Sequence, residues 1–223
     1  MQVQDWDELC DQYMMARGWP ECATVTATIG ASLPPISHEW FKTALQNGHK
    51  KWFVSWVFRT WLTVPGELFD GMIRAAVYEV NPSTNDQFIQ PCLRAFGVIA
   101  VNEALLTYLA EGSNFEKAGA VNALYWAQRM GESGIPEVDI SSIRDRKREM
   151  FLREFISNED TNVRRSIIPS LNLDELVYPD ELKPLVQQAI LIARAQPDDY
   201  IRHRVEVQLG NERLFRPLPP RSA

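Results

Sequence analysis

The chain has 223 residues, 45% of them hydrophobic and 23% charged, and carries a net charge of −6 at pH 7. The hydrophobic content is enough for a substantial core and excludes an intrinsically disordered chain. The acidic surplus argues against a dedicated nucleic-acid-binding protein, because such proteins usually carry an excess of basic residues.

One structural unit recurs along the chain: an amphipathic helix, a short polar turn, a second helix and a short turn that often contains proline. The first helices are expected to begin near Asp5, Ser37, Gly66, Asn102, Arg144 and Asp180. Their partner helices are expected to begin near Pro20, Lys50, Asn85, Asn114, Thr161 and Asp198. Equivalent starts lie roughly 30 to 45 residues apart, which is the repeat length of helical hairpins that stack into solenoids.

Apolar residues at three- and four-residue steps predict the buried faces of the first helices. The stripe of the sixth first helix consists of Leu182, Leu185, Val186, Ala189, Ile190 and Ala193. A stripe of this kind must be buried against a neighbouring helix.

Two segments are harder to assign. Ala23–Ile29 alternates and is rich in β-branched residues, as a strand would be. Its place in the repeat nevertheless predicts a second helix, since a lone strand would have no sheet to join. Met130–Ser142 contains Gly131, Gly134 and Pro136, and it is expected to be an exposed loop of the kind that often carries function.

The turns and second-helix starts resemble those of HEAT repeats. In Asn158–Arg165 an acidic turn residue is followed by a Val-Arg pair, as in that family. Asp198–Arg202 is a second instance, and Ser113–Lys117 and Gly48–Trp52 are looser ones.

This resemblance covers the whole chain as architecture and implies an all-α, right-handed α-α solenoid of about six HEAT-like helical hairpins. The solenoid would form one domain, residues 1–214, followed by a Pro-rich tail, residues 215–223, that is extended or disordered. The alternative arrangement is an irregular helical bundle. HEAT proteins mostly bind other macromolecules along the surface formed by successive helices, so the resemblance also implies a binding function.

Aromatic and cationic side chains are interleaved on the second helix of the second repeat. The aromatic ones are Trp52, Phe53, Trp56, Phe58 and Trp61, and their cationic neighbours are His49, Lys50, Lys51 and Arg59. Such a mixture can stack on nucleic-acid bases, lie at a membrane interface or bind a protein. The helical spacing also fits a core helix packed on two sides, which is the simpler interpretation. Trp52 and Trp56 are the candidate partner-binding residues of this helix.

A basic cluster, Arg144, Arg146, Lys147 and Arg148, follows the expected loop. At the expected start of a helix, positive charge opposes the helix dipole and gives no local stability. The cluster is therefore a candidate site for an acidic partner or for an acidic face of a second copy of the chain. The alternative is solvated charge, paired with nearby carboxylates.

Lys117, Arg164 and Arg202 are expected in a row along successive second helices. The row could bind an acidic partner or phosphates, and Arg164 and Arg202 are its candidate binding residues. The alternative is a ladder, in which each cation bonds to the acidic turn residue of a neighbouring repeat.

No arrangement of residues indicates catalysis, a metal site or a cofactor site. The three histidines belong to different repeats, and the glycines form no phosphate-binding loop. Cys10, Cys22 and Cys92 fit no zinc or redox motif, which favours free thiols in a reducing cytoplasm. The N-terminus lacks the pattern of a signal peptide, and no uninterrupted apolar run approaches the roughly 18 residues of a membrane span.

The sequence therefore predicts a small cytoplasmic protein that binds another protein as a scaffold or adaptor, without enzymatic activity. A specific version is an immunity or inhibitor protein, an acidic binder that neutralises a basic partner. The second prediction is a nucleic-acid-binding protein such as a HEAT-like alkylpurine DNA glycosylase, which the chain resembles in repeat number and size. It departs from that class in net charge, and no segment matches the catalytic motif of the class, so no catalytic residue is assigned.

Overall fold

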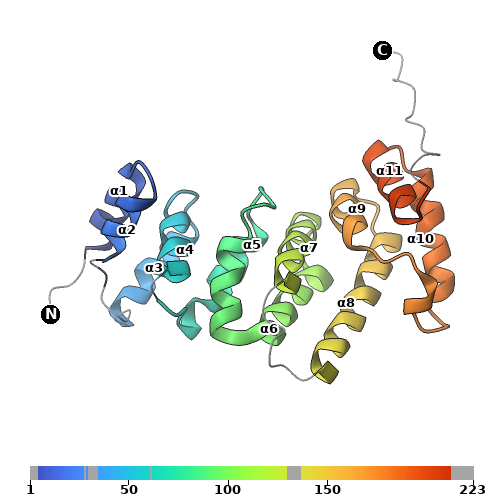
Figure 1. Ribbon diagram of the computed structural model, residues 1–223, viewed down its shortest axis with the longest axis horizontal. Coiled ribbons are helices and arrows are strands. Elements are labelled where there is room, and N and C mark those ends of the chain that lie inside the picture. Colours follow the sequence, from blue (N-terminus) through green and yellow to red (C-terminus); the bar gives the residue numbers. More distant parts are fainter. Residues whose placement is uncertain (1–4, 28, 30–34, 61, 130–136, 212–223) are drawn as a thin grey trace, which may run out of the picture. The chain divides into compact units, whose positions relative to one another are not determined.

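The computed structural model describes residues 5–27, 29, 35–60, 62–129 and 137–211 (Figure 1). Within these residues the regular secondary structure is helical throughout and includes no β-strand, which confirms the predicted all-α class. The tail at 215–223 and most of the expected loop at Met130–Ser142 lie outside the described residues. The helices belong to two compact units. Unit 1 comprises Met1–Ala104 and Trp126–Gly131, and unit 2 comprises Leu105–Tyr125 and Glu132–Ala223.

Unit 1 is built from consecutive helices that pack in pairs. They are α1 (Trp6–Met15), α2 (Trp19–Ala27), α3 (His38–Leu45), α4 (Lys50–Thr60), α5 (Phe69–Val77) and most of α6 (Asp86–Glu111). Short 3-10 turns, Pro35–Ser37 and Gly66–Leu68, lead into α3 and α5. α1 packs on α2 and α3 packs on α4, as expected of the first two hairpins.

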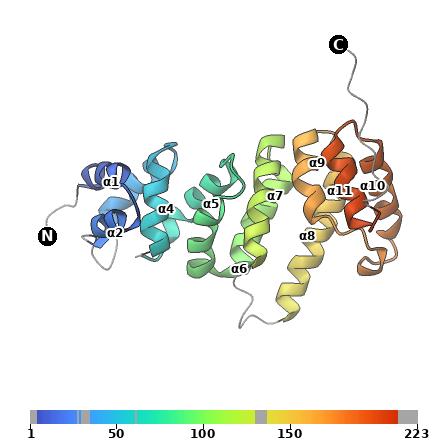
Figure 2. The ribbon, with the colours of Figure 1, turned by 45° about the horizontal axis from the view of Figure 1, so that its top comes forward.

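Unit 2 contains the end of α6, most of α7 (Asn114–Arg129), and four further helices. These are α8 (Glu137–Ser157), α9 (Thr161–Ile167), α10 (Lys183–Ala195) and α11 (Asp199–Gln208). The 3-10 turns Ile168–Ser170 and Glu175–Val177 lie between α9 and α10. α8 packs on α9, α10 packs on α11, and α10 also packs on α8, so two hairpins lie against each other (Figure 2).

The second helices begin almost where the sequence predicts. α4, α7 and α9 begin at the expected Lys50, Asn114 and Thr161, and α6 and α11 begin one residue later than expected. The prediction was accurate here because polar capping residues mark these starts. Asp160 caps α9 by accepting hydrogen bonds from two backbone N–H groups, those of Asn162 and Val163.

Each capping residue lies one position before the first residue of its helix. Asp160 caps α9, and Ser113 caps α7. Ser113 forms a capping box, because its backbone N–H donates to Glu116 Oε2 while Glu116 N–H donates to the Ser113 hydroxyl.

The helical assignment of Ala23–Ile29 is confirmed as far as Ala27, where α2 ends. Thr24 shows how a β-branched residue is accommodated in this helix. Its hydroxyl donates to the Pro20 carbonyl oxygen at 3.0 Å, one turn back along the helix.

The fourth first helix does not begin near Asn102. α6 continues from Asp86 to Glu111, and its backbone leaves the helical conformation only at Gly97, with φ 81° and ψ 167°. The break therefore lies at Gly97, where a residue without a Cβ can adopt a conformation that is nearly closed to other residues. The apolar pattern continues through the break, so periodicity alone placed it too late.

α6 is the one helix among the described residues that could cross a membrane by length and composition alone. A count of uninterrupted apolar residues did not identify it, because polar residues interrupt the run. One of these, Arg94, donates to the carbonyl oxygens of Phe58 and Arg59 at the end of α4.

The prediction that a helix starts near Arg144 is wrong, because α8 already begins at Glu137. Ile140 is buried and belongs to the same packed face as Phe151 and Phe155, which explains why the helix extends so far forward. In α10 the expected stripe is buried except for Leu185, which is only half-buried.

Side chains from second helices close the hairpins by bonding to the ends of first helices. Asn85 Nδ2 donates to the Ala76 carbonyl oxygen in α5 at 2.8 Å. Arg164 Nε donates to the Phe155 carbonyl oxygen in α8 at 3.1 Å, and its NH2 group donates to Ile156. The last carbonyl groups of a helix have no hydrogen-bond partner within the helix. The side chains of Asn85 and Arg164 supply donors for these carbonyl groups.

Gly97→Ala should reduce the free energy of unfolding by about 1–3 kcal/mol, because alanine is strained at this positive φ although there is space for its Cβ. Gly48→Ala is the matched control. Gly48 also has space for a Cβ but has no positive φ, and a change within about 0.5 kcal/mol is expected there. Urea unfolding of both variants would measure the difference, and equal effects would contradict this account of α6.

Candidate functional site

The aromatic side chains of α4 lie mainly in the core of unit 1. Phe53 and Phe58 are fully buried. The Phe53 ring lies 5.5 Å from the Tyr13 ring, and the Phe58 ring lies 5.4 Å from the Phe41 ring, measured between centroids. These contacts join α4 to α1 and α3, so packing accounts for this part of the interleaved pattern.

The two candidate partner-binding residues of α4 are half-buried and already packed. The Trp52 ring lies 5.2 Å from the Phe88 ring of α6 and 5.0 Å from Lys51 Nζ. The Trp56 ring lies 5.9 Å from the Tyr13 ring. Both contacts are made within unit 1, which favours a structural role for Trp52 and Trp56. Trp61 lies outside the described residues.

The lysines at the start of α4 are paired with carboxylates from other parts of unit 1: Asp7 of α1 and Glu79, which follows α5. Lys50 Nζ lies 2.6 Å from Asp7 Oδ1, and Trp40 Nε1 donates to the same oxygen. These hydrogen bonds, that of Lys50 above all, lower the pKa of Asp7. Lys51 Nζ lies 2.6 Å from Glu79 Oε2.

The predicted basic cluster lies well inside α8 and not at its start. Arg148 NH1 donates to Asp145 at 2.8 Å and to the Val177 carbonyl oxygen at 3.2 Å, so it joins α8 to the segment before α10. Lys147 is buried, Arg144 is half-buried, and Arg146 is exposed. The dipole argument for this cluster does not apply, because its position is beyond the first turn of the helix.

The three cations of the predicted row have different bonding partners in the structure. Arg164 is buried and bonds to the two carbonyls at the end of α8, so it is not available to a partner. Arg202 pairs with Asp199 in its own first turn. Lys117 Nζ lies 2.8 Å from Glu154 Oε1, a residue of α8 and not the acidic turn residue that the ladder alternative expects.

Arg165, which was not a candidate, also makes an ion pair between hairpins of unit 2. Its NH1 lies 2.8 Å from Asp198 Oδ2, the capping residue of α11, and its guanidinium lies 5.0 Å from the centre of the Tyr200 ring. Nothing in the repeat pattern distinguished Arg165 from Arg164. The signal that could have done so is Val163, whose burial fixes which face of α9 points inward.

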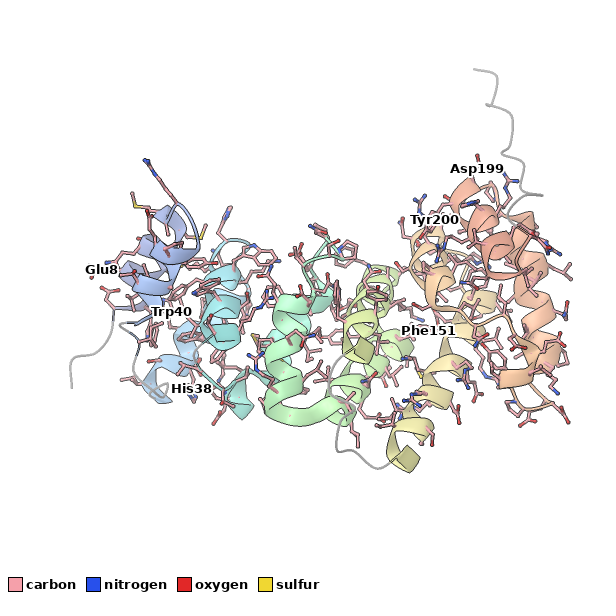
Figure 3. The ribbon with its side chains drawn as sticks, in the orientation of Figure 1. Glu8, His38, Trp40, Phe151, Asp199 and Tyr200 are labelled. Atoms are coloured by element: carbon pink, nitrogen blue, oxygen red, sulfur yellow. The ribbon has the colours of Figure 1, made fainter. Side chains whose placement is uncertain are left out.

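These contacts connect three hairpin turns into one continuous edge of unit 2. Asn158 Nδ2, in the turn before α9, donates to Asn114 Oδ1 at the start of α7 at 2.8 Å. Arg165 then links α9 to the start of α11, where Figure 3 shows Asp199 and Tyr200 at the helix end. We call this surface the turn edge of unit 2. Its residues are 111–117, 154–165 and 197–202.

Aromatic side chains are exposed on the turn edge. Phe115 is 52% exposed and Tyr200 is 39% exposed. Each is the second residue of its helix, α7 or α11, so they occupy equivalent positions in two hairpins. At that position α9 carries the exposed Asn162.

Among the described residues, no group of three or more His, Cys, Asp or Glu side chains could hold a metal ion. Burial raises the pKa of the Cys92 thiol to about 12, so this cysteine stays protonated at neutral pH.

Comparison with protein-family models, with curated proteins and with solved structures finds no match for this chain.

Adjacent arginines of α9 should differ sharply in their effect on stability. Arg164→Gln should reduce the free energy of unfolding by about 1–3 kcal/mol, because two carbonyls at the end of α8 lose their donor in a buried place. Arg165→Gln should cost about 1 kcal/mol or less, because its ion pair is largely exposed. Denaturant titration would measure both, and equal costs would show that Arg164 does not close the hairpin.

Proposed function

We propose that this protein is a small cytoplasmic protein-binding scaffold or adaptor, built as a right-handed solenoid of about six HEAT-like hairpins. The observation that carries the proposal is the turn edge of unit 2, where three hairpin turns are bonded to one another and still expose aromatic side chains. Ordered, bonded turns form a rigid platform, and exposed aromatic residues are enriched where proteins bind one another.

The charges of the chain support a basic partner. The net charge is −6, and the second-helix cations that would have made a basic row are engaged within the chain. An acidic protein attracts basic partners and repels polyanions, because the summed charge steers encounters before contact. An immunity or inhibitor protein that neutralises a basic protein is the specific form of this proposal.

The continuous solenoid can be tested by its dimensions in solution. A compact chain of this length has a radius of gyration of about 17 Å. Six hairpins stacked in a line should give a clearly larger value and an asymmetric distance distribution in small-angle X-ray scattering. A value near that of a compact chain would support an irregular bundle instead and would remove the solenoid from the proposal.

The binding function can be tested by isolating a partner and reconstituting the complex. The protein should capture a basic protein from its source cell, and the two purified components should form a stoichiometric complex at physiological salt in analytical ultracentrifugation. Duplex DNA should bind no more tightly than about 1–100 μM under the same conditions. Tighter, salt-dependent DNA binding, or release of an alkylated base by the pure protein, would contradict the proposal and favour the glycosylase alternative.

A further inference from the structure

The turn between α3 and α4 contains an asparagine followed directly by a glycine, Asn47-Gly48. It is the one pair of this kind in the sequence. In such a pair the backbone nitrogen of the glycine follows the asparagine side-chain amide in the chain, and no Cβ on the glycine hinders an approach of the two groups. The pair therefore has the composition that favours reaction of an asparagine amide with its own backbone.

The surroundings of this pair leave both reacting groups accessible. Asn47, Gly48 and His49 are exposed, so water and hydroxide reach the turn. No atom lies within 4 Å of the place that a Cβ on Gly48 would take, so the backbone there has room to rotate. Within the part of the chain that the structure describes, the Gly48 N–H forms no hydrogen bond, as is usual for the first N–H groups of a helix.

Asn47 also caps α4. Its Oδ1 accepts hydrogen bonds from the backbone N–H groups of His49, at 2.9 Å, and Lys50, at 3.1 Å. These bonds hold the amide in place, so they must open before the amide can react. Opening the turn uncovers no buried side chain at Asn47, Gly48 or His49, because all three already face solvent. Reaction in the folded chain should therefore be slower than in a free peptide, but it does not require the core to unfold.

We propose that Asn47 is a site of spontaneous deamidation in the folded protein, a property separate from partner binding. The Gly48 nitrogen gives its proton to hydroxide and bonds to Asn47 Cγ, which closes a succinimide ring. The Cγ–Nδ2 bond breaks, and Nδ2 takes up a proton from water and leaves as ammonia. Water then opens the ring at one of its two carbonyl carbons and leaves aspartate or isoaspartate at position 47.

The two products should affect α4 in opposite directions. Aspartate keeps the length of the main chain, accepts the same two N–H bonds and adds negative charge at the positive end of the helix dipole. The first turn of α4 has no acidic residue, whereas α1, α9 and α11 are capped by aspartate. Isoaspartate adds a methylene group to the main chain, so its carboxylate no longer lines up with the N–H groups and the cap is lost.

The test is to incubate the full chain at mildly alkaline pH and to analyse its peptides by mass spectrometry. The peptide that contains Asn47 should gain the mass difference between an amide and an acid and should separate into two products by chromatography. The rate should rise with pH, because the Gly48 nitrogen must lose its proton before it attacks.

Two controls come from the chain itself. Gly48→Ala should keep the fold, since there is space for a Cβ, and should slow the conversion several-fold because the new methyl group hinders the nitrogen. Asn81 is exposed and accepts a turn hydrogen bond from the Ser83 N–H, but the Pro82 nitrogen that follows it has no proton to lose. Asn81 should remain unchanged in the same sample.

Thermal unfolding distinguishes the two products. Asn47→Asp, which encodes the first product, should unfold at a higher temperature than the unchanged protein, and Asn47→Ala, which lacks the cap, at a lower one. The purified isoaspartate form should unfold near the temperature of Asn47→Ala.

The inference is overturned if the folded chain shows no conversion under conditions in which a synthetic peptide of residues 44–52 converts. An equal rate in Gly48→Ala would also overturn it, because attack by the Gly48 nitrogen would then not be the route. A lower unfolding temperature for Asn47→Asp than for the unchanged protein would contradict the expected effect of the aspartate product on α4.

Discussion

The hydrogen bonds that Asn85 and Arg164 donate to the ends of α5 and α8 are the constraint on which the geometry of their hairpins depends. A helix ends with carbonyl groups that have no partner inside the helix, and leaving them buried and unbonded would cost free energy. Asn85 and Arg164 solve the same problem in different units, since each lies at the start of a second helix and donates to the end of the first. The position of these donors fixes how the two helices of a hairpin meet, and this in turn fixes which residues of the turn face outward.

The fold could be predicted where local chemistry marks an element. Asp160 and Asp198 cap their helices, Asn158 accepts a backbone hydrogen bond in its turn, and the helices follow directly. Prediction failed where the apolar pattern continues across a change in direction. Gly97 breaks α6 by its backbone conformation, and neither Gly97 nor its neighbours interrupt the run of apolar residues enough to reveal it. The start of α8 was misplaced for the opposite reason, because breakers suggested a loop where Ile140 is already part of a packed helical face.

The positions of cations in the sequence do not show which of them are exposed to a binding partner. Adjacent residues on a helix point about 100° apart. Arg164 is therefore buried and Arg165 is exposed, although both are arginines and they are neighbours in the sequence. Arg164 is buried under the end of α8, whereas Arg165 reaches the cap of α11 and the Tyr200 ring. Neither interpretation of the row holds for all three cations. Lys117 pairs with Glu154 in the last turn of α8, Arg164 bonds to backbone carbonyls, and Arg202 pairs with a carboxylate of its own helix.

The hairpin turns of unit 2 place capping residues and exposed residues next to one another. Residues that set the geometry of the turns, such as Ser113 and Asp160, bond to backbone groups and are tied to the fold. Phe115 and Glu159, which are exposed, lie one or two positions away from these capping residues. Partner choice can therefore change through exposed positions while the hairpin connections stay the same. For the proposed basic partner, this means that affinity resides mainly in exposed charges and rings, where salt screens the carboxylates but leaves the stacking contacts. Binding should thus lose only part of its strength as salt rises, unlike the steep salt dependence of a purely electrostatic complex.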